Sequence, residues 1–411
     1  MSDVFPLDSI PRPVLAIAAK LRSVGHEAWF VGGAVRDTLL AARPGGGGAR
    51  EAGDFDIATS ATPDVVQALF RRTVPIGLEH GTIAVLGADG RAHEVTTFRR
   101  DIETDGRHAV VRFGVSLEED LARRDFTINA VAVHPETGEV TDPFGGRADI
   151  GAGVLRAVGD PVRRFLEDRL RILRALRFAA ILEFEIEAQT WRALREQAGE
   201  LAHLSRERVR DEWLKTLAAA SPGRGVALWR DAGVLQEVWP ELADLPDAAP
   251  GWLDASDTRE PVLLTAALLW RGGVGSEAAE GAVRRLRFSN HDVGRVRRVV
   301  EALGDGPPAP GQATALRRWL SRHRESARDA IAVSEPRTRR PDLLKAVQAI
   351  EAAGDALSIH DLAVTGEDLK GVGLKAGKAM GDVLRRLLEE VLEQPWRNNR
   401  EWLLARAREL S

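Results

Sequence analysis

The feature that most constrains the fold of this chain is a change of sequence character near residue 150. Before it, short apolar runs with strand-like alternation are mixed with helical stretches and glycine turns. From about residue 154 onward, apolar residues recur at helical spacing, and the segment 160–182 is predicted to be a helix. The sequence therefore predicts an α+β fold, with a mixed sheet in the N-terminal part and a helical remainder.

Individual elements of the first part can be predicted from turn residues and alternation. The predicted strands are EAWFVGG (27–33), DFDIAT (54–59), the hairpin TIAVLGADGRAHEVTTF (82–98) and TINAVAV (127–133). AVRDTLLAA (34–42) is predicted to form a helix directly after the first strand. In the helical remainder, GDGPPAPG (304–311) has three prolines and three glycines in eight residues, which is typical of a linker.

Composition excludes several classes of protein. None of the 411 residues is cysteine, so disulfides, including any with a partner chain, and zinc–thiolate sites are excluded. No apolar run approaches the roughly 18 residues of a membrane helix. The N-terminus lacks the basic start and apolar stretch of a signal peptide. We therefore expect a cytoplasmic protein without a membrane partner. The net charge of −4 does not by itself indicate a nucleic-acid partner.

Two carboxylates lie one residue apart in GDFDIAT. At strand period Asp54 and Asp56 point to the same face, while Phe55 between them points into the core. Two like charges side by side destabilise each other unless a cation lies between them. The two acids are therefore either solvated surface residues or ligands of a divalent metal, for which carboxylate oxygens are suitable ligands.

Neighbouring motifs favour the metal site. About twenty residues earlier, VGGAVRD puts the N–H groups of Gly32 and Gly33 at the start of a helix, where they can bind phosphate, and Arg36 lies one turn on. A phosphate site beside paired acids suits Mg²⁺-dependent nucleotidyl transfer. Glu94, on a neighbouring strand, is the candidate third carboxylate, which would position the metal or accept the proton of the attacking 3′-hydroxyl. The alternative for Glu94 is a cross-strand surface acid.

Eight ordered blocks resemble those of a known family. They are VGGAVRDTLL, DFDIATSATP, GLEHGTI, EVTTFRR, RRDFTINAVAV, DPFGGRADI, FLEDRLRILRALRFAA and ERVRDEWLKTL. Together they look like the class II tRNA nucleotidyltransferases, the bacterial CCA-adding enzymes, and their relatives the bacterial poly(A) polymerases. The resemblance is dense over residues 25–240 and continues more thinly to the end of the chain.

The resemblance implies a polymerase-β-like nucleotidyltransferase head followed by an all-helical neck, body and tail. Carried over to this chain, the divisions are a catalytic head (1–150), a neck with a nucleobase template (151–222), a body (223–303) and a tail that binds tRNA (312–411). The segment 98–114 corresponds to a flexible loop that helps the family switch from CTP to ATP.

The resemblance also implies roles for individual residues. Asp54 and Asp56 would bind Mg²⁺ and, with Glu94, form the catalytic group. The residues expected at the triphosphate end of the site are Gly32, Gly33, Arg36 and Asp37.

Further nucleotide-binding residues follow from two later blocks. In RRDFTINA, Arg124 and Asp125 match positions that contact the ribose and its 2′-hydroxyl, and Asn129 belongs to the same block. The nucleotide-binding residues expected in the neck are Asp168, Arg171, Arg174 and Arg177. Glu207 and Arg208, in ERVRDEWLKTL, are expected to be structural.

The block EDRLR (167–171) suggests how bases are selected. On a helix, Asp168 and Arg171 share a face and Glu167 can pair with Arg171, which by default indicates a surface helix with salt bridges. If that face lines the nucleotide pocket, the carboxylate accepts a bond from the amino group of cytosine or adenine, and the guanidinium donates to the ring nitrogen. Guanine and uracil present a carbonyl beside an N–H, and unpaired buried polar groups can give discrimination of about 10⁴. In the family that the chain resembles, these two residues form the protein template.

The resemblance therefore implies template-independent addition of CCA to the 3′ end of tRNA from CTP and ATP. A CC-adding or A-adding partial enzyme and a poly(A) polymerase remain alternatives, and a catalytically dead RNA-binding paralogue is disfavoured by the intact acids, glycine turn and template pair. The arginines of the predicted body form either a solvated face or a surface that follows tRNA phosphates; they are Arg284, Arg285, Arg287, Arg295, Arg297 and Arg298.

Overall fold

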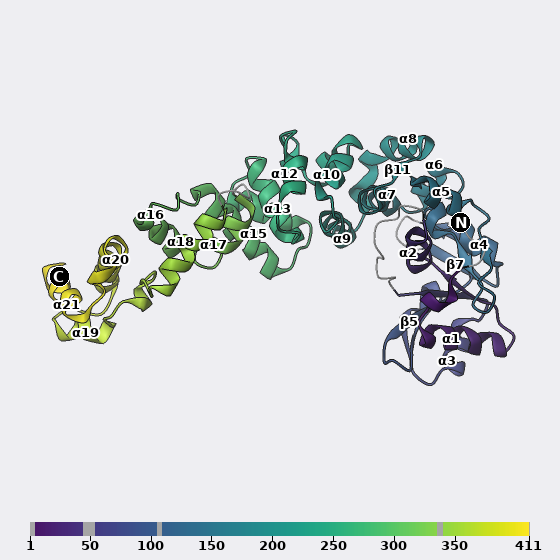
Figure 1. Cartoon of the computed structure of the whole chain (residues 1–411), viewed down its shortest axis with the longest axis horizontal. Helices are drawn as coiled ribbons and strands as arrows, with labels where there is room; N and C mark the ends of the chain where they lie inside the picture. Colours follow the sequence, from purple (N-terminus) through teal and green to yellow (C-terminus); the bar gives the residue numbers. More distant parts are fainter. Residues whose placement is uncertain (1–4, 44–53, 105–108, 335–339, 411) are drawn as a thin grey trace. The chain divides into compact units, whose positions relative to one another are not determined.

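The computed structural model describes residues 5–43, 54–104, 109–334 and 340–410. The chain divides into two compact units. The N-terminal unit comprises the residues up to Ala219 together with Arg224–Val238, and the C-terminal unit comprises Ala220–Gly223 together with the chain from Trp239 onward. The large sheet is confined to the early, purple and blue part of the chain, and helices make up most of the rest (Figure 1). The predicted α+β class with a helical C-terminal part is confirmed.

The N-terminal unit is built on a seven-stranded mixed sheet with the order β3-β4-β5-β2-β1-β8-β9. Its strands are β1 (Ala28–Val31), β2 (Asp56–Thr59), β3 (Thr73–Gly77), β4 (Thr82–Leu86), β5 (Ala92–Thr97), β8 (Ala132–Val133) and β9 (Val140–Thr141). β2 and β5 run parallel, with Ile57 opposite Val95, whereas the other neighbours are antiparallel. Asp56 directly precedes Ile57, and Glu94 directly precedes Val95, so the parallel pairing of the two strands puts Asp56 and Glu94 side by side.

Two small sheets complete the strands. β6 (Arg99–Thr104) pairs antiparallel with β7 (Ala109–Phe113), and β10 (Val154–Leu155) pairs parallel with β11 (Glu185–Ile186). Residues 105–108, within the segment compared above to a flexible loop, lie outside the described residues.

The predicted strand over 127–133 is wrong for most of its length. Thr127–Asn129 form a 3-10 turn, η3, and only Ala132–Val133 form a strand. Buried polar side chains hold the turn, because Asn129 Nδ2 donates to Asp125 Oδ1 at 3.0 Å and Thr127 Oγ1 donates to Asp149 Oδ2 at 2.6 Å. Such local side-chain bonds compete with the regular hydrogen bonding of a strand.

The predicted helix over 160–182 is two helices, α6 (Pro161–Glu167) and α7 (Leu170–Leu182). Asp168 lies between them in an extended conformation, with φ −152° and ψ 104°. Its Oδ1 accepts the N–H of Leu170 at 3.0 Å. An aspartate that bonds to the backbone in this way favours the start of a helix over its interior, which explains the break.

The N-terminal unit contains further α-helices. They are α1 (Arg12–Ser23), α2 (Gly33–Ala41), α3 (Pro63–Leu69), α4 (Leu117–Ala122), α5 (Gly146–Ala152), α8 (Ala188–Glu196), α9 (Arg206–Leu217) and α11 (Val234–Val238). A further helix, α10 (Pro222–Asp231), begins in the four-residue piece assigned to the C-terminal unit. The helix predicted directly after the first strand is confirmed as α2.

Aromatic side chains pack edge-on at two places in the N-terminal unit. Phe55 is 1% exposed and packs edge-on against Phe5 and Phe30, with ring centroids 6.5 Å and 6.0 Å away. The inward direction predicted for Phe55 is therefore confirmed. Phe126 packs edge-on against Phe178 of α7 at 5.8 Å, and α9 packs against α7. These contacts place α7 and α9 beside the segment that precedes η3.

All regular elements described in the C-terminal unit are helices. Its helices are α12 (Ala249–Ala255), α13 (Pro261–Arg271), α14 (Ser276–Arg285), α15 (Asn290–Asp305), α16 (Ala313–His323), α17 (Ala327–Ser334), α18 (Arg340–Ala352), α19 (Gly366–Gly371), α20 (Lys378–Glu393) and α21 (Arg400–Leu410). α13 is the most buried of its long helices, with an unbroken buried run at 262–269. None of the helices described in either unit has the length and apolar character needed to span a membrane. The division into head, neck, body and tail remains a prediction.

Candidate active site

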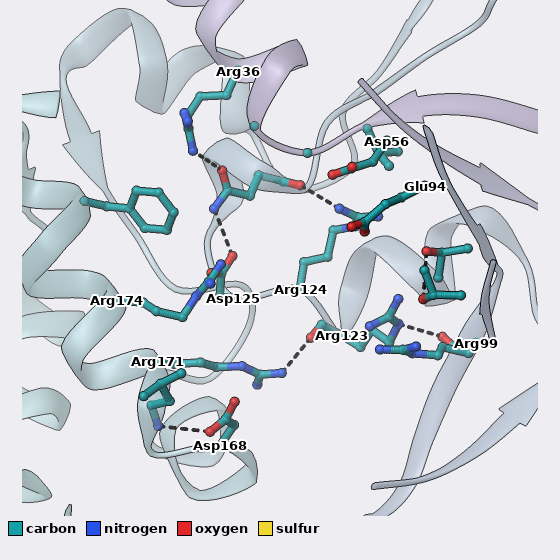
Figure 2. Close-up of a pocket in the computed structure, with 18 of the residues that line it drawn as sticks. Arg36, Asp56, Glu94, Arg99, Arg123, Arg124, Asp125, Asp168, Arg171 and Arg174 are labelled. Carbon is teal, nitrogen blue, oxygen red and sulfur yellow. Dashed lines mark hydrogen bonds and ion pairs between the residues drawn. The ribbon is translucent and has the colours of Figure 1, made fainter. Parts of the chain in front are cut away.

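The N-terminal unit contains a pocket of about 650 Å³ with a strongly charged lining. Eight of its lining residues are arginines: Arg36, Arg99, Arg123, Arg124, Arg171, Arg174, Arg177 and Arg208. Four are acidic: Asp56, Glu94, Asp125 and Asp168. Figure 2 shows Asp56 and Glu94 on one side of the pocket and Arg174 and Arg171 on the other, with Arg124 between them. An excess of guanidinium groups suits a polyanionic ligand such as a nucleoside triphosphate.

The pocket brings together most of the residues singled out from the sequence. These are Gly32, Gly33, Arg36, Asp56, Glu94, Arg124, Asp125, Asn129, Asp168, Arg171, Arg174 and Arg177. Asp54 and Asp37 are not part of the lining. Asp54 is exposed just before β2, and Asp37 accepts a bond from Nε of Arg36 at 2.8 Å.

Asp56 lies among like charges. Burial and the charges of Glu94 and Asp54 raise its pKa from an ordinary 3.8 to about 6, against the opposing effect of Arg124. In the described part of the chain, no three acidic or histidine side chains converge closely enough to form a metal site. The mutual repulsion of these carboxylates is nevertheless the condition that a divalent cation relieves, and their oxygen atoms are the donors that Mg²⁺ prefers. The residues present therefore fit a magnesium ion.

Gly32 lies against the Asp56 carboxylate at the start of α2. Its φ of +84° is in the region that favours glycine, and a Cβ there would lie 2.7 Å from Asp56 Oδ2. Among the described residues no side chain caps the start of α2, so its first N–H groups are available to an anion. The glycine thus lets a phosphate-binding helix start approach the acidic strand closely.

A chain of buried bonds joins α2 to α7 through Asp125. Arg36 Nη1 donates to Asn129 Oδ1 at 2.9 Å, and Asn129 Nδ2 donates to Asp125 Oδ1 at 3.0 Å. Asp125 also accepts Phe126 N–H at 2.8 Å and Nη2 of Arg174 at 2.6 Å. Burial raises the pKa of Asp125, but the Arg174 charge and these bonds outweigh burial and lower it to about 2. Asp125 is therefore ionised and fully engaged.

Asp120, in α4, was not identified from the sequence. It is 1% exposed and accepts bonds from Nη2 of Arg123 at 2.7 Å, Nη2 of Arg124 at 3.2 Å and the N–H of Arg99 at 3.3 Å. Burial raises its pKa, but the charges of Arg123 and Arg124 hold the pKa below its ordinary value. One buried carboxylate thus orients two pocket arginines and the start of β6. Asp120 precedes Arg123 by three residues and Arg124 by four, and this spacing is the sequence signal that could have revealed the ion pairs.

The predicted pairing of Glu167 with Arg171 is confirmed, but the helical face that Asp168 was expected to share with Arg171 is not. Arg171 Nη1 donates to Glu167 Oε2 at 2.8 Å, and Arg171 Nη2 donates to the carbonyl of Arg123 at 3.0 Å. The helix break at Asp168 removes that residue from α7. Asp168 still lines the pocket near Arg171 because its carboxylate is held from α9 by Arg208.

Glu212 of α9 is a second residue that sequence reasoning missed. It is 3% exposed, and its Oε2 accepts Nε of Arg177 at 2.5 Å. The guanidinium of Arg177 lies 4.1 Å from the ring centroid of Phe178. Burial lowers the pKa of Arg177, whereas Glu212 opposes that shift. α9 therefore supplies bonding partners to two groups of the pocket lining.

Three parts of the chain match known protein families. Residues 28–156 match the poly A polymerase head domain. Residues 183–245 match an RNA- and SrmB-binding site of polymerase A, and residues 260–407 match domain 2 of tRNA nucleotidyltransferases.

Whole-chain relatives agree with these matches. The chain is 37% identical over 403 residues to the CCA-adding enzyme of Bacillus velezensis, which covers 95% of this chain and 96% of the relative. The solved structure of the Bacillus stearothermophilus CCA-adding enzyme in complex with CTP matches with a TM-score of 0.80 at 34% identity, covering 97% of this chain and 98% of that one. The Thermotoga maritima CCA-adding enzyme complexed with tRNA_CCA has the same fold, with a TM-score of 0.70 at 21% identity and coverage of 100% and 99%.

Proposed function

Because the chain belongs to the CCA-adding enzymes, a family of tRNA nucleotidyltransferases, we propose that its arginine-rich pocket adds CCA to the 3′ end of tRNA from CTP and ATP. The reaction joins the 3′-oxygen of the tRNA to the α-phosphorus of the nucleotide and releases pyrophosphate. The observation that carries the proposal is that carboxylates suited to a metal and an Asp–Arg pair suited to a base line one pocket. The tRNA, CTP and ATP are its substrates, and we place the enzyme in the cytoplasm with them.

Asp54 and Asp56 are the proposed ligands of Mg²⁺, and nucleotidyltransferases of this family generally use a divalent metal. When bound, the ion would offset phosphate charge and polarise the α-phosphate. Glu94, beside Asp56 on the parallel strand, would accept the proton of the 3′-hydroxyl or help to orient Asp56.

The triphosphate would lie between the start of α2 and the pocket arginines. The N–H groups of Gly32 and Gly33 face an anion there, and Arg36 is fixed by its bonds to Asp37 and Asn129. Arg124, held by Asp120, supplies a further charge beside Asp56. Groups that are already fixed lose little freedom when they bind phosphate, which favours a productive orientation.

For the ribose, the contact predicted for Asp125 remains a prediction. Its carboxylate already accepts bonds from three residues, so we assign it chiefly to orienting Arg174. Arg124, Arg174 and Arg177 are the lining cations that this proposal assigns to the nucleotide.

Asp168 and Arg171 would select the base. The carboxylate accepts from the exocyclic amino group that cytosine and adenine share, and the guanidinium donates to the adjacent ring nitrogen. Both contacts become repulsive with uracil or guanine, because these bases present a carbonyl beside an N–H. The predicted helical body and tail would hold the tRNA, which keeps its 3′ end at the pocket through successive additions.

Extension of three tRNA transcripts, ending at the discriminator base, at C and at CC, tests the proposal. Each is incubated with Mg²⁺ and CTP, ATP or both, and the products are read at single-nucleotide resolution. We expect growth to CCA and no further. Extension that stops at CC, or that occurs only on the CC-ended transcript, would indicate a partial enzyme, and a long A ladder would indicate a poly(A) polymerase.

A further inference from the structure

Asp168 is held by a side chain from a different helix. Nη2 of Arg208, in the first turn of α9, donates to Oδ2 of Asp168 at 2.8 Å. The N–H of Leu170 donates to Oδ1 at 3.0 Å. Arg208 also lines the pocket, although the sequence suggested only a structural role for it. Both side chains remain partly exposed there, so the pair faces the ligand space.

The two groups assigned to base reading are fixed by different means. Arg171 belongs to α7, and its guanidinium donates to Glu167 Oε2 at 2.8 Å and to the carbonyls of Arg164 and Arg123 at 3.0 Å each. Asp168 belongs to neither α6 nor α7. Its carboxylate therefore depends on the bonds from Arg208 and Leu170 for its direction.

We propose that Arg208 is a positioning residue for base selection. By holding Oδ2 of Asp168, it sets the distance and angle between the carboxylate acceptor and the Arg171 donor. The inference rests on the proposed function, in which these two groups read the base. Each carboxylate oxygen has two lone-pair directions, so Asp168 keeps acceptor capacity for an amino group while it is bonded to Arg208.

The expected consequence is a loss of discrimination. Without Arg208, the Asp168 side chain turns away from the base edge. The carboxylate then binds the amino group of cytosine or adenine more weakly, and it also repels the carbonyl of uracil or guanine more weakly. A charge-assisted bond from a guanidinium is short and directional. Lysine can supply one such bond but not the planar donor geometry of arginine, so Arg208→Lys should retain part of the selectivity that Arg208→Ala loses.

The experiment measures single-turnover incorporation of CTP, ATP, UTP and GTP on full-length enzyme with transcripts ending at the discriminator base and at CC. The variants are Arg208→Ala, Arg208→Lys and the control Arg210→Ala. Arg210 lies two residues farther along α9, bonds to Asp211 at 2.7 Å and is not part of the pocket lining. We expect Arg208→Ala to lower the ratio of correct to wrong incorporation at least about 10-fold, with Arg208→Lys intermediate and Arg210→Ala unchanged.

This ratio does not depend on the fraction of enzyme that is folded, so partial unfolding of a variant cannot imitate the result. An unchanged ratio in Arg208→Ala, with only a slower correct incorporation, would overturn the proposal. A raised KM for tRNA with an unchanged ratio would also overturn it and would make Arg208 an RNA contact.

Asp168→Ala separates this inference from the function on which it rests. If Asp168→Ala loses selectivity while Arg208→Ala keeps it, the role of Arg208 alone is contradicted. If the wild-type enzyme adds no nucleotide, or if Asp168→Ala keeps full selectivity, the proposed function or its base-reading pair is contradicted, and the role of Arg208 with it.

Discussion

Charged side chains are frequent in both units, but those in and behind the pocket are more deeply buried than many of those in the C-terminal unit. Asp125 lines the pocket and Asp120 lies behind it, bonded to two pocket arginines; both are almost completely buried and bond to groups from other segments. In the C-terminal unit, the Arg318–Glu389 pair has side chains that are 44% and 61% exposed. Water competes with an exposed pair, which contributes about 0–1 kcal/mol, whereas a buried charge that loses its partner costs several kcal/mol.

Arginines of the predicted body form ion pairs of intermediate to high exposure. Arg295 pairs with Asp329 and Glu260, Arg285 pairs with Glu241, and Arg284 and Arg297 both pair with Glu280. The Arg284–Glu280 pair lies within α14, whereas the other pairs join different segments of the C-terminal unit. Both the solvated face and a contact of these arginines with tRNA stay predictions. Arginine therefore lines the pocket in one unit and joins helices in the other.

The largest expected effect comes from removing a charge at the catalytic end of the pocket. Asp56→Asn should lower incorporation of both nucleotides by at least about 10³-fold, because the charge proposed to hold the metal is lost while the shape of the side chain is kept. Single-turnover extension measures the rate, and filter binding should show tRNA affinity within about 2-fold of wild type. Asp64→Asn, at an exposed acid of α3, is the control. Near-normal activity of Asp56→Asn would show that this pocket acid is no more important for catalysis than an exposed acid such as Asp64.

The next effect tests a buried partner rather than a ligand. Asp120→Ala should lower the free energy of unfolding of the N-terminal unit by about 3 kcal/mol, since Arg123 and Arg124 lose their common acceptor. Urea denaturation with hydrogen exchange of the sheet measures this change. Glu118→Ala, at an exposed position of the same helix, should change stability by under about 0.5 kcal/mol. Equal effects of the two variants would contradict the importance of burial.

A pH-dependent contribution is expected from Asp125. Its folded pKa of about 2 is below the ordinary 3.8, so ionisation stabilises the fold at pH values above 3.8. This contribution, roughly 2 kcal/mol, should be lost as the pH falls from about 4 toward 2. The stability difference between wild type and Asp125→Asn should therefore shrink over that range in denaturant titrations. A difference that is constant with pH would show that Asp125 is not preferentially ionised in the fold.

The smallest effect is expected at the exposed pair. Arg318→Ala should change the free energy of unfolding of the C-terminal unit by about 1 kcal/mol or less. Thermal denaturation measures this change. A loss as large as that of Asp120→Ala would erase the difference between buried and exposed pairs.

Local patterns were sufficient to identify one end of the pocket. Strand parity predicted the inward Phe55, and hairpin signals placed Glu94 on a strand of the same sheet as Asp56. The glycine turn predicted the start of α2. Glu167 and Arg171 were four residues apart and did pair. Each of these relations depends on neighbouring residues or on adjacent elements, which sequence periodicity reports directly.

Relations between distant segments were not visible in the sequence. Arg208 and Asp168 are separated by 40 residues, and Arg177 and Glu212 by 35, so only the packing of α9 on α7 brings them together. The break at Asp168 was missed because the apolar spacing on either side continues at helical period. An aspartate two residues before the N–H that it caps was the available signal.

The close approach of Gly32 to Asp56 has a genetic consequence. Every missense change at codon 32 adds a Cβ, and that atom would meet a carboxylate oxygen at 2.7 Å on a backbone with φ of +84°. At Gly90, by contrast, φ is +76° but no atom lies within 4 Å of an added Cβ, so asparagine, which tolerates this conformation, can be accommodated. After selection of a saturation-mutagenesis library for active enzyme, only synonymous variants should therefore remain at codon 32. Some amino-acid changes should remain at codon 90.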